Sequence, residues 1–593
     1  MTYRAPVAEI AFTMRHVAGL DRAIAEGLEP DLTADLAETI LQEAGRFATD
    51  RIAPLNRIGD RHGTPFRDGA VTMPPGWRET YRAWTEAGWN ALPGPVDHGG
   101  QGLPVLLNSG CVEMWNSASL AFGLGPLLTM GGIEALAAHG SEELKERYLD
   151  RIVSGEWTAT MNLTEPQAGS DLGALRTRAE RAGDGSYRIT GAKIYITYGE
   201  HDLTDNIVHL VLARLPDAPP GTRGISLFLV PKVLPDGTRN DVRCQGIEHK
   251  LGIHASPTCT MVFGDHGGAT GWLVGEENRG LACMFTMMNN ARLAVGIQGV
   301  AIAERAYQQA LAYAGERRQG RAPGAAQEGM SLIVEHPDVR RNLLTMKALT
   351  QAARAICYLT AEALDRAHRS PDPAARRAAN ERASLLTPVA KAFSSDIGVE
   401  VASIGVQVHG GMGFVEETGA AQHLRDARIL PIYEGTNGIQ AIDLVTRKLP
   451  LSGGAAVRAQ IAAMRRTVAR LIREATPAFG QTAPRLREAI ESLDRATSAM
   501  LKSLAGNAPH EALAGATPYL RLFALAQGAA SLADGALAAN ALMAGGDGDP
   551  AHPARIALCR FFAENLATAA PGLEHNVLAG AGFVDDASLA LAS

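Results

Sequence analysis

A run of short segments rich in Ile, Val, Thr and Tyr, lying between two much longer helical patterns, most constrains the fold of this 593-residue chain. It begins near Trp157 with WTATMNLTEP and continues through YRITGAKIYITYG, NIVHLVLARL, GISLFLVPK and TCTMVFGD. Turn signals such as Asp184-Gly185 and Asp236-Gly237 separate the segments. This pattern is typical of an antiparallel β domain, closed as a barrel or packed as a sandwich.

Helical patterns with apolar residues at i, i+3 and i+4 precede and follow this run. A chain of this length is too long for a single hydrophobic core. We therefore predict an α+β protein with four parts. They are an N-terminal extension and helical domain (residues 1–156), a β-barrel or sandwich domain (157–275), a helical bundle (276–450) and an extra helical C-terminal domain (451–593), with Pro450 and the following LSGG as the linker.

The composition excludes several classes of protein. A formal net charge of −7 gives no electrostatic reason to bind nucleic acid or an acidic membrane. The closest two of the six cysteines, Cys244 and Cys259, are too far apart for a CxxC metal or redox motif. Glu9 and Arg15 interrupt the start of the chain, which argues against a secretory signal, and no uninterrupted apolar run reaches membrane-spanning length. We expect a soluble cytoplasmic protein without a bound metal.

Two segments of the β region carry groups suited to a polar ring system. In MNLTEPQAGSDLGALRT, the hydroxyls of Thr164 and Ser170 and several main-chain amides surround a turn and could bind a ring edge or a phosphate. The alternative is a well-capped passage from strand to loop. In GAKIYITYG, Tyr195 and Thr197 are two residues apart and share a face of a regular strand, where they could form a stacking wall with a donor or belong to an ordinary core.

Two segments of the second helical region could bind phosphate. ERRQGR closes a long helical pattern with adjacent arginines, which could clamp a pyrophosphate or form a solvated helix end. QVHGGMGF contains Gly410 and Gly411, which let a main chain approach a ligand closely but are also common in turns.

A single acid stands out in RDARILPIYEGTNGIQ. Glu434 follows an apolar run, Ile429 to Ile432, that we predict to be a buried strand, and precedes Thr436, a candidate cap for the next helix. A carboxylate near a helix N-terminus is favourable without any catalytic role. In a dry setting the same group would instead be a strong base.

Taken together, these segments resemble the acyl-CoA dehydrogenase family in family order, over roughly residues 35 to 450. TEPQAGSD is similar to the flavin-loop signature of the family, and QVHGGMGF with RDARILPIYEGTNGIQ is similar to its C-terminal signature. The segment before Asp31 and the tail after Pro450 resemble the branch of 3-methylmercaptopropionyl-CoA dehydrogenases.

The resemblance implies FAD as cofactor and assigns residues to it. Contacts with the flavin and the rest of FAD fall on Met161, Leu163, Thr164, Ser170, Tyr195, Thr197, Arg317, Gln407, Gly410, Gly411 and Thr436. Ser170, Arg292 and Glu434 match substrate-binding positions. The chain departs from the family at Tyr195, where Trp is usual, at Gln319-Gly320, where a Thr-Phe pair is common, and at Asn437-Gly438, where many members have a Gln.

The resemblance also implies a reaction in which Glu434 is the catalytic base. It would take the α-proton of an acyl-CoA thioester while the β-hydride passes to the flavin, giving the 2-enoyl-CoA. The branch favours a short acyl chain such as 3-(methylthio)propionyl-CoA; a plain short- or medium-chain acyl-CoA dehydrogenase or an acyl-CoA oxidase is the alternative. An electron-transferring flavoprotein is the expected acceptor, and a homodimer the expected assembly. A DNA-associated flavoprotein is disfavoured because acidic and basic residues balance in the tail.

Overall fold

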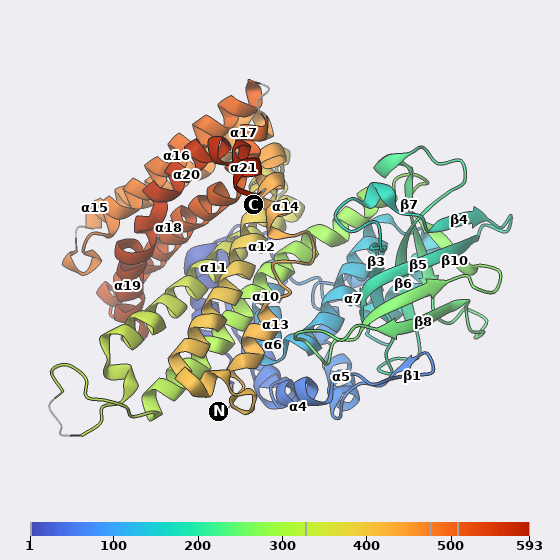
Figure 1. Cartoon of the computed structure of the whole chain (residues 1–593), viewed down its shortest axis with the longest axis horizontal. Coiled ribbons are helices and arrows are strands. Elements are labelled where there is room, and N and C mark those ends of the chain that lie inside the picture. Colours follow the sequence, from blue (N-terminus) through green and yellow to red (C-terminus); the bar gives the residue numbers. More distant parts are fainter. Residues whose placement is uncertain (1–2, 326–328, 475, 507–508, 592–593) are drawn as a thin grey trace. The chain divides into compact units, whose positions relative to one another are not determined.

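The computed structural model describes residues 3–325, 329–474, 476–506 and 509–591 (Figure 1). Residue contacts divide the chain into two compact units. The barrel unit comprises Arg46–Pro104 and Ala118–Ala291. The bundle unit comprises Met1–Gly45, Val105–Ser117 and Arg292–Ser593.

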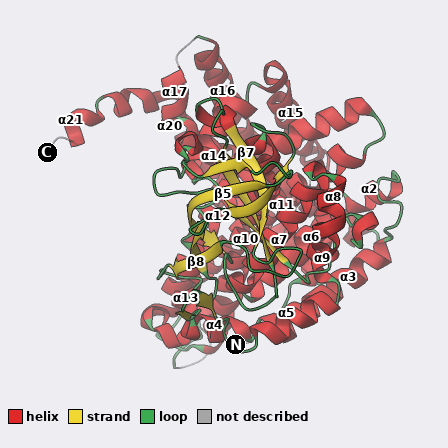
Figure 2. Cartoon of the chain, turned by 90° about the vertical axis from the view of Figure 1, so that its right-hand side faces the viewer, coloured by secondary structure: helices red, strands yellow, loops and turns green. Residues whose placement is uncertain are grey.

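The barrel unit is built around a sheet of eight strands (Figure 2). The strands are β3 (Thr158–Asn162), β4 (Arg178–Arg181), β5 (Tyr187–Thr197), β6 (Ile207–Arg214), β7 (Ile225–Pro231), β8 (Val242–Ile247), β9 (Thr258–Phe263) and β10 (Ala269–Val274). Five strands pair in the order β10-β7-β6-β4-β5, and β5 also pairs with β10, so these strands form a closed ring. Strand β9 pairs with β5 outside this ring, and β8 pairs with β9. The prediction of a β domain is confirmed.

Most neighbouring strands of the sheet are antiparallel, as the short turns predict, but β3 and β4 both run parallel to β6, with Thr158 opposite Ile207 and Arg178 opposite Arg214. Parallel strands cannot be joined by a tight hairpin, and both pairs satisfy this rule because other strands of the chain lie between β3 or β4 and β6. Side chains alternate along β6 between two hydrophobic clusters. Leu210 and Leu212 pack in the cluster that includes residues of the flanking helices, whereas Val211 and Ala213 pack in a cluster formed mainly by the strands. Both faces of this strand are therefore buried.

Helices flank this sheet within the barrel unit. They are α4 (Leu55–His62), α5 (Trp77–Glu86), α7 (Leu120–His139), α8 (Glu142–Leu144) and α9 (Asp150–Val153), and a small hairpin pairs β1 (Phe66–Arg67) with β2 (Ala70–Val71). Helix α7 packs on β3. A Cβ at Gly132 would lie 2.5 Å from the Cβ of Ala159, so only glycine permits this close approach. Ser119 and Ser141 cap α7 and α8 through their side chains.

The bundle unit is helical and combines long helices with short ones. They are α1 (Val7–Phe12), α2 (Leu20–Ala25), α3 (Ala34–Phe47), α6 (Val105–Ala118), α10 (Gly280–Glu316), α11 (Pro337–Arg369), α12 (Pro373–His409), α13 (Ala420–Ala427) and α14 (Asn437–Asp443), followed by α15 (Ala455–Glu474), α16 (Thr482–Ala505), α17 (Pro509–Ala514), α18 (Ala516–Ala544), α19 (Ala551–Phe561), α20 (Ala570–Asp585) and α21 (Ala587–Leu591). Helix α10 begins in the barrel unit and enters the bundle unit at Arg292.

Helix α18 connects the C-terminal helices to the rest of the bundle unit, because it packs against α11 and α12 as well as α16, α19 and α20 (Figure 1). Polar groups also fix the bundle. Arg354 on α11 is fully buried and bonds to Glu113 of α6 at 2.6 Å and to Glu304 of α10 at 2.9 Å. Tyr358 donates to Glu113 at 2.6 Å. One guanidinium thus joins three helices.

Two helices, α7 and α18, are long and apolar enough to cross a membrane by length and composition, although no such run was expected. In each of them 83% of the most apolar window is buried inside the protein. Burial in a core accounts for their apolar composition.

Two local predictions are wrong. Residues 428–435 form turns rather than a strand, and Ile432 is 48% exposed. A β-bulge between Lys193 and Ile196 interrupts the regular alternation expected for Tyr195 and Thr197, because two residues there face one on β9.

Candidate active site

Glu434 lies in the turn between α13 and α14 in a strained backbone conformation. Its φ of 56° places a non-glycine residue in the left-handed region, which costs about 1–3 kcal/mol and persists only where surrounding contacts enforce it. Thr436 follows and caps α14, with its side chain accepting from the N–H of Ile439. Among the residues that the structure describes, no hydrogen bond uses the Glu434 N–H.

Three buried polar side chains hold this turn, and sequence analysis identified none of them. Lys391 of α12, which is 0% exposed, donates to the carbonyl oxygens of Leu430 at 3.0 Å and Gly435 at 2.8 Å. Gln440 of α14 donates to the Glu434 carbonyl at 3.1 Å. Tyr433 donates to the third, Gln298 of α10, at 2.5 Å. The signal that could have revealed Lys391 is its position inside the apolar helical stretch PVAKAF.

Burial and two positive charges act in opposite directions on the pKa of Glu434. Burial raises the pKa of its carboxyl, and the positive charges of Arg292 and Lys391 oppose that rise. Arg292, which is 8% exposed, lies 3.7 Å from Asp443, and its Nε has no partner among the described residues. A carboxylate whose pKa is raised is, once ionised, a stronger base than an exposed one.

In the barrel unit, the predicted flavin-binding residues Met161, Leu163, Thr164 and Ser170 lie at the end of β3 and in the loop after it. Met161 is buried, Leu163 and Thr164 are half-buried, and Ser170 is exposed. The Thr164 carbonyl accepts from the Ile194 N–H at 2.9 Å, which brings this loop to the bulge of β5.

A buried ion pair, also missed by sequence analysis, anchors the same loop. Lys193 Nζ lies 2.9 Å from Glu165 Oε1, with side chains 0% and 3% exposed, and also donates to the Leu163 carbonyl. The Glu165 carboxylate accepts further bonds from the Thr177 N–H and hydroxyl and from the Arg176 N–H. Burial raises the pKa of Glu165, but Lys193 and these donors outweigh it and lower the pKa to about 2.

The surface beside this loop fits a flat aromatic ligand. Tyr195 lies in the bulge with φ 59° and is 60% exposed, and Thr197 is half-buried on the same strand. An aromatic side chain held in a strained and exposed position lacks a core to pack against. The ring of FAD could cover it, so the residues present fit the cofactor.

The predicted phosphate-binding residues of the bundle unit lie at two helix ends that are joined by a ring stack. The ring of Tyr313 near the end of α10 stacks on His409 of α12 at 4.5 Å. Arg317 directly follows α10, Gln407 lies in the last turn of α12, and Gly410 and Gly411 follow α12. A Cβ at either glycine would meet no atom within 4 Å, so the backbone is open to a ligand.

The departure at Gln319-Gly320 is accommodated by a short paired segment. Arg318 forms a β-bridge with Leu332, and Gln319 donates its N–H to the Ser331 carbonyl at 3.0 Å. Asn437, the other departure, bonds to Lys391 and Ser395 of α12. Both unusual segments therefore have defined partners within the bundle unit.

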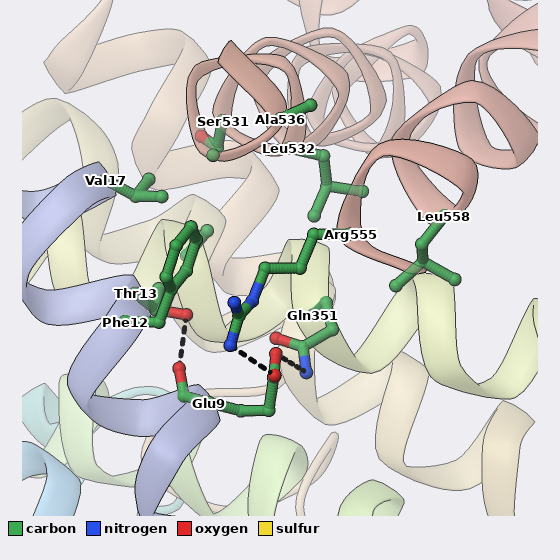
Figure 3. A pocket seen from close by; sticks show the side chains of 12 residues that line it. Glu9, Phe12, Thr13, Val17, Gln351, Ser531, Leu532, Ala536, Arg555 and Leu558 are labelled. Carbon is green, nitrogen blue, oxygen red and sulfur yellow. Dashed lines mark hydrogen bonds and ion pairs between the residues drawn. The ribbon is translucent and has the colours of Figure 1, made fainter. Parts of the chain in front are cut away.

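A separate pocket of the bundle unit lies where α1, α11, α18 and α19 meet (Figure 3). It is lined by Glu9, Phe12, Thr13, Val17, Gln351, Ala355, Ser531, Leu532, Gly535, Ala536, Arg555 and Leu558. Arg555 reaches Glu9 at 2.8 Å and Asp549 at 3.0 Å, and its guanidinium lies 3.8 Å from the centre of the Phe12 ring. Two carboxylates neutralise this arginine, so the pocket does not suit the anionic phosphates of a coenzyme.

Comparison with known proteins identifies the family. Residues 35–156, 160–266 and 278–449 match the N-terminal, middle and C-terminal domains of acyl-CoA dehydrogenase, and 459–586 match a domain described as acetyl-CoA dehydrogenase C-terminal like. The chain is 47% identical to the 3-methylmercaptopropionyl-CoA dehydrogenase of Ruegeria pomeroyi, over 95% of this chain and 96% of that protein. It is 38% identical to a butyryl-CoA dehydrogenase of Syntrophomonas wolfei, over 70% of each chain.

A solved structure shares the fold. The acyl-CoA dehydrogenase of Bacillus anthracis complexed with FAD matches with a TM-score of 0.75 and 20% identity, covering 92% of this chain and 88% of that one. The resemblance inferred from the two signatures is confirmed, as is the extra C-terminal domain. The chain belongs to the acyl-CoA dehydrogenase family and is an FAD-dependent oxidoreductase.

Proposed function

We propose that this enzyme oxidises a short acyl-CoA thioester, 3-(methylthio)propionyl-CoA, to its 2-enoyl-CoA, with Glu434 as the base. The carboxylate of Glu434 takes the α-proton as the bond between the α- and β-carbons becomes double. Bound FAD would supply the acceptor for the β-hydrogen, which leaves with its electron pair as a hydride. The thioester therefore loses one proton and one hydride in all, and the carboxyl keeps the proton.

The observation that best supports this proposal is the position of Glu434, which has a strained backbone conformation and is acted on by two positive charges. A base must be ionised to act, and the positive charges of Arg292 and Lys391 oppose the rise that burial gives to the pKa of Glu434. The Glu434 N–H, which bonds to no described residue, is a donor that could stabilise a developing negative charge on the thioester oxygen. One residue would then supply both the base and part of the stabilisation of its product.

The substrate assignment rests on similarity along almost the whole chain, because the relative from Ruegeria pomeroyi matches 95% of this sequence, including the C-terminal helices. The butyryl-CoA dehydrogenase covers only 70% of the chain at lower identity. It supports a plain short-chain acyl-CoA as the second candidate.

Turnover of a panel of thioesters with an artificial electron acceptor tests the assignment. Pentanoyl-CoA is the matched control, because it differs from 3-(methylthio)propionyl-CoA only by CH₂ in place of sulfur; butyryl-CoA and octanoyl-CoA vary the length. We expect kcat/KM for 3-(methylthio)propionyl-CoA to exceed that for octanoyl-CoA by at least about tenfold, since each methylene changes specificity by that order. A preference for octanoyl-CoA would contradict the proposal.

We further propose an electron-transferring flavoprotein as acceptor, a cytoplasmic location and a homodimeric assembly. All six cysteines are free and buried, which suits a reducing compartment. Phe414, 88% exposed, and Met412, 49% exposed, follow the glycine pair and offer an apolar surface to a second copy of the chain. Stoichiometric hydrogen peroxide release during turnover would contradict the acceptor and point to an oxidase, and a monomer by light scattering would contradict the assembly.

A further inference from the structure

Lys391 has so far entered the account only as a positive charge that acts on Glu434, although it is fully buried and also bonds to the turn that carries the proposed base. Its ammonium group has three N–H donors and three acceptors: the carbonyl oxygens of Leu430 and Gly435, and Asn437 Oδ1 at 2.9 Å. A neutral amine has only two N–H groups and could satisfy only two of these acceptors. The geometry therefore fits a protonated lysine.

The acceptors of Lys391 lie on both sides of Glu434 in the sequence. Leu430 comes four residues before the base and Gly435 directly after it, so one cation holds both arms of the turn. Asn437 strengthens this attachment, because its amide donates to Ser395 Oγ at 2.9 Å and to Asp396 at 2.7 Å, both on α12. Contacts of this kind are what a left-handed φ at Glu434 requires to persist.

We propose that Lys391 is a positioning residue for proton abstraction: it holds the Glu434 turn in its strained conformation, and its positive charge favours the ionised form of the base. This inference rests on the proposed role of Glu434. The charged groups that act on Glu434 are Arg292 of α10 and Lys391 of α12. Burial lowers the pKa of Lys391 itself to about 7; the negative charges of Glu434 and Asp396 oppose this fall and Arg292 adds to it, so the positive charge of Lys391 is complete only below that pH. Lys391 does not touch the reacting atoms in this account, so its effect passes through Glu434.

The charge and the contacts have separable consequences. Loss of the ammonium removes a positive charge that lowers the pKa of Glu434, so that pKa rises and a higher pH is needed to ionise the base. Loss of the hydrogen bonds lets the turn relax, which lowers the rate at every pH. A purely structural lysine would affect folding or flavin content without moving the pH at which the base ionises.

Proton abstraction can be measured apart from oxidation with ethoxyacetyl-CoA. An ether oxygen replaces the β-carbon of this thioester, which can lose its α-proton but has no β-hydride to transfer. The holoenzyme is incubated with it in D₂O, and incorporation of deuterium at the α-carbon is followed by mass spectrometry across a pH series. Lys391→Met removes the charge and the donors, Lys391→Arg keeps the charge, and Ser394→Ala is the matched control.

Ser394 is a suitable control because it is a fully buried polar residue of the same helix, α12, and its hydroxyl contacts Cys357 at 3.4 Å instead of the catalytic turn. We expect Lys391→Met to slow exchange by about 100-fold at neutral pH, the order expected for a misplaced base, and to move the acid limb of the profile to higher pH. Lys391→Arg should exchange more slowly than the wild type, but the acid limb of its pH profile should lie near that of the wild type. Ser394→Ala should match the wild type.

Thermal unfolding and amide hydrogen exchange of residues 429–440 are measured on the holoenzyme of each variant. We expect faster exchange of that segment in Lys391→Met and not in Ser394→Ala. An unmoved acid limb in Lys391→Met overturns the inference. If Lys391→Met does not fold, the test rests on Lys391→Arg. An acid limb that moves to higher pH in Lys391→Arg, although the positive charge is retained, overturns the inference. Absence of exchange in the wild type would instead refute the role of Glu434, so the two failures are distinguishable.

Discussion

The ion pair of Glu165 and Lys193 gives the sharpest prediction about the loop that is predicted to bind the flavin. Replacing Glu165 by Leu leaves the Lys193 ammonium, 0% exposed, with the Leu163 carbonyl as its remaining partner. It also removes the acceptor of the Thr177 and Arg176 N–H groups. An uncompensated buried charge costs about 3–5 kcal/mol, so we expect Glu165→Leu to destabilise the barrel unit by that amount.

The reverse substitution is predicted to cost less. In Lys193→Met the Glu165 carboxylate keeps its bonds from Thr177 and Arg176, so the loss is about 1.5–3 kcal/mol, the value of a hydrogen bond to a charged group. The double variant removes both charges and should therefore cost less than the sum of the single variants, with a coupling of about 1–3 kcal/mol.

Native-state amide hydrogen exchange of residues 158–178 measures this local stability, and the ratio of flavin to protein reports the consequence for the cofactor. We expect faster exchange and lower FAD content in Glu165→Leu than in Lys193→Met. Because the pKa of Glu165 is lowered to about 2, the stability it supplies is present above the ordinary pKa range of Glu and is lost as the pH falls toward 2. Strictly additive variants, or single variants that each cost under about 0.5 kcal/mol, would refute the reasoning.

Three other predictions concern the bundle unit. Glu434→Gln should unfold at a temperature equal to or above that of the wild type at pH 8, because a carboxyl whose pKa is raised by burial destabilises the fold when it is ionised; a lower melting temperature would contradict this. Arg354→Met leaves Glu113 and Glu304 buried without their cation and should cost about 3–5 kcal/mol in denaturant unfolding, so a cost under about 1 kcal/mol would be inconsistent with the burial. Arg555→Met should cost only about 1 kcal/mol, since its partner Glu9 is partly exposed, and should raise the sensitivity of the N-terminal segment to proteases; unchanged proteolysis would argue against the contact.

The order of the elements could be predicted from sequence because periodicity reports which side chains are buried. The period-two segments after Trp157 are strands, and the long helical patterns are α10, α11 and α12. The strand predicted before Glu434 is absent for a reason that periodicity does not include. Glu434, two residues after this apolar run, has a left-handed backbone conformation, and side chains distant in the sequence bind the segment. The apolar residues therefore form turns.

The residues that hold the site could not be predicted, because their partners are distant in the sequence. Lys391 lies 39 and 44 residues from the two carbonyl oxygens that it binds, and Lys193 lies 28 residues from Glu165. A charged residue in a helical or β pattern is normally assigned to the surface, whereas both lysines are fully buried. The bulge at Tyr195 was missed for a related reason, since alternation assumes one residue for each partner.

The central claim, that Glu434 removes the α-proton, is tested most directly by rapid mixing of oxidised holoenzyme with 3-(methylthio)propionyl-CoA without oxygen. Absorbance of the oxidised flavin is followed in the wild type and in Glu434→Gln, with equal flavin content verified first. We predict rapid bleaching in the wild type and a rate at least about 1000-fold lower in the variant, which retains binding but has no base. Bleaching of the variant at a rate near that of the wild type would contradict the account.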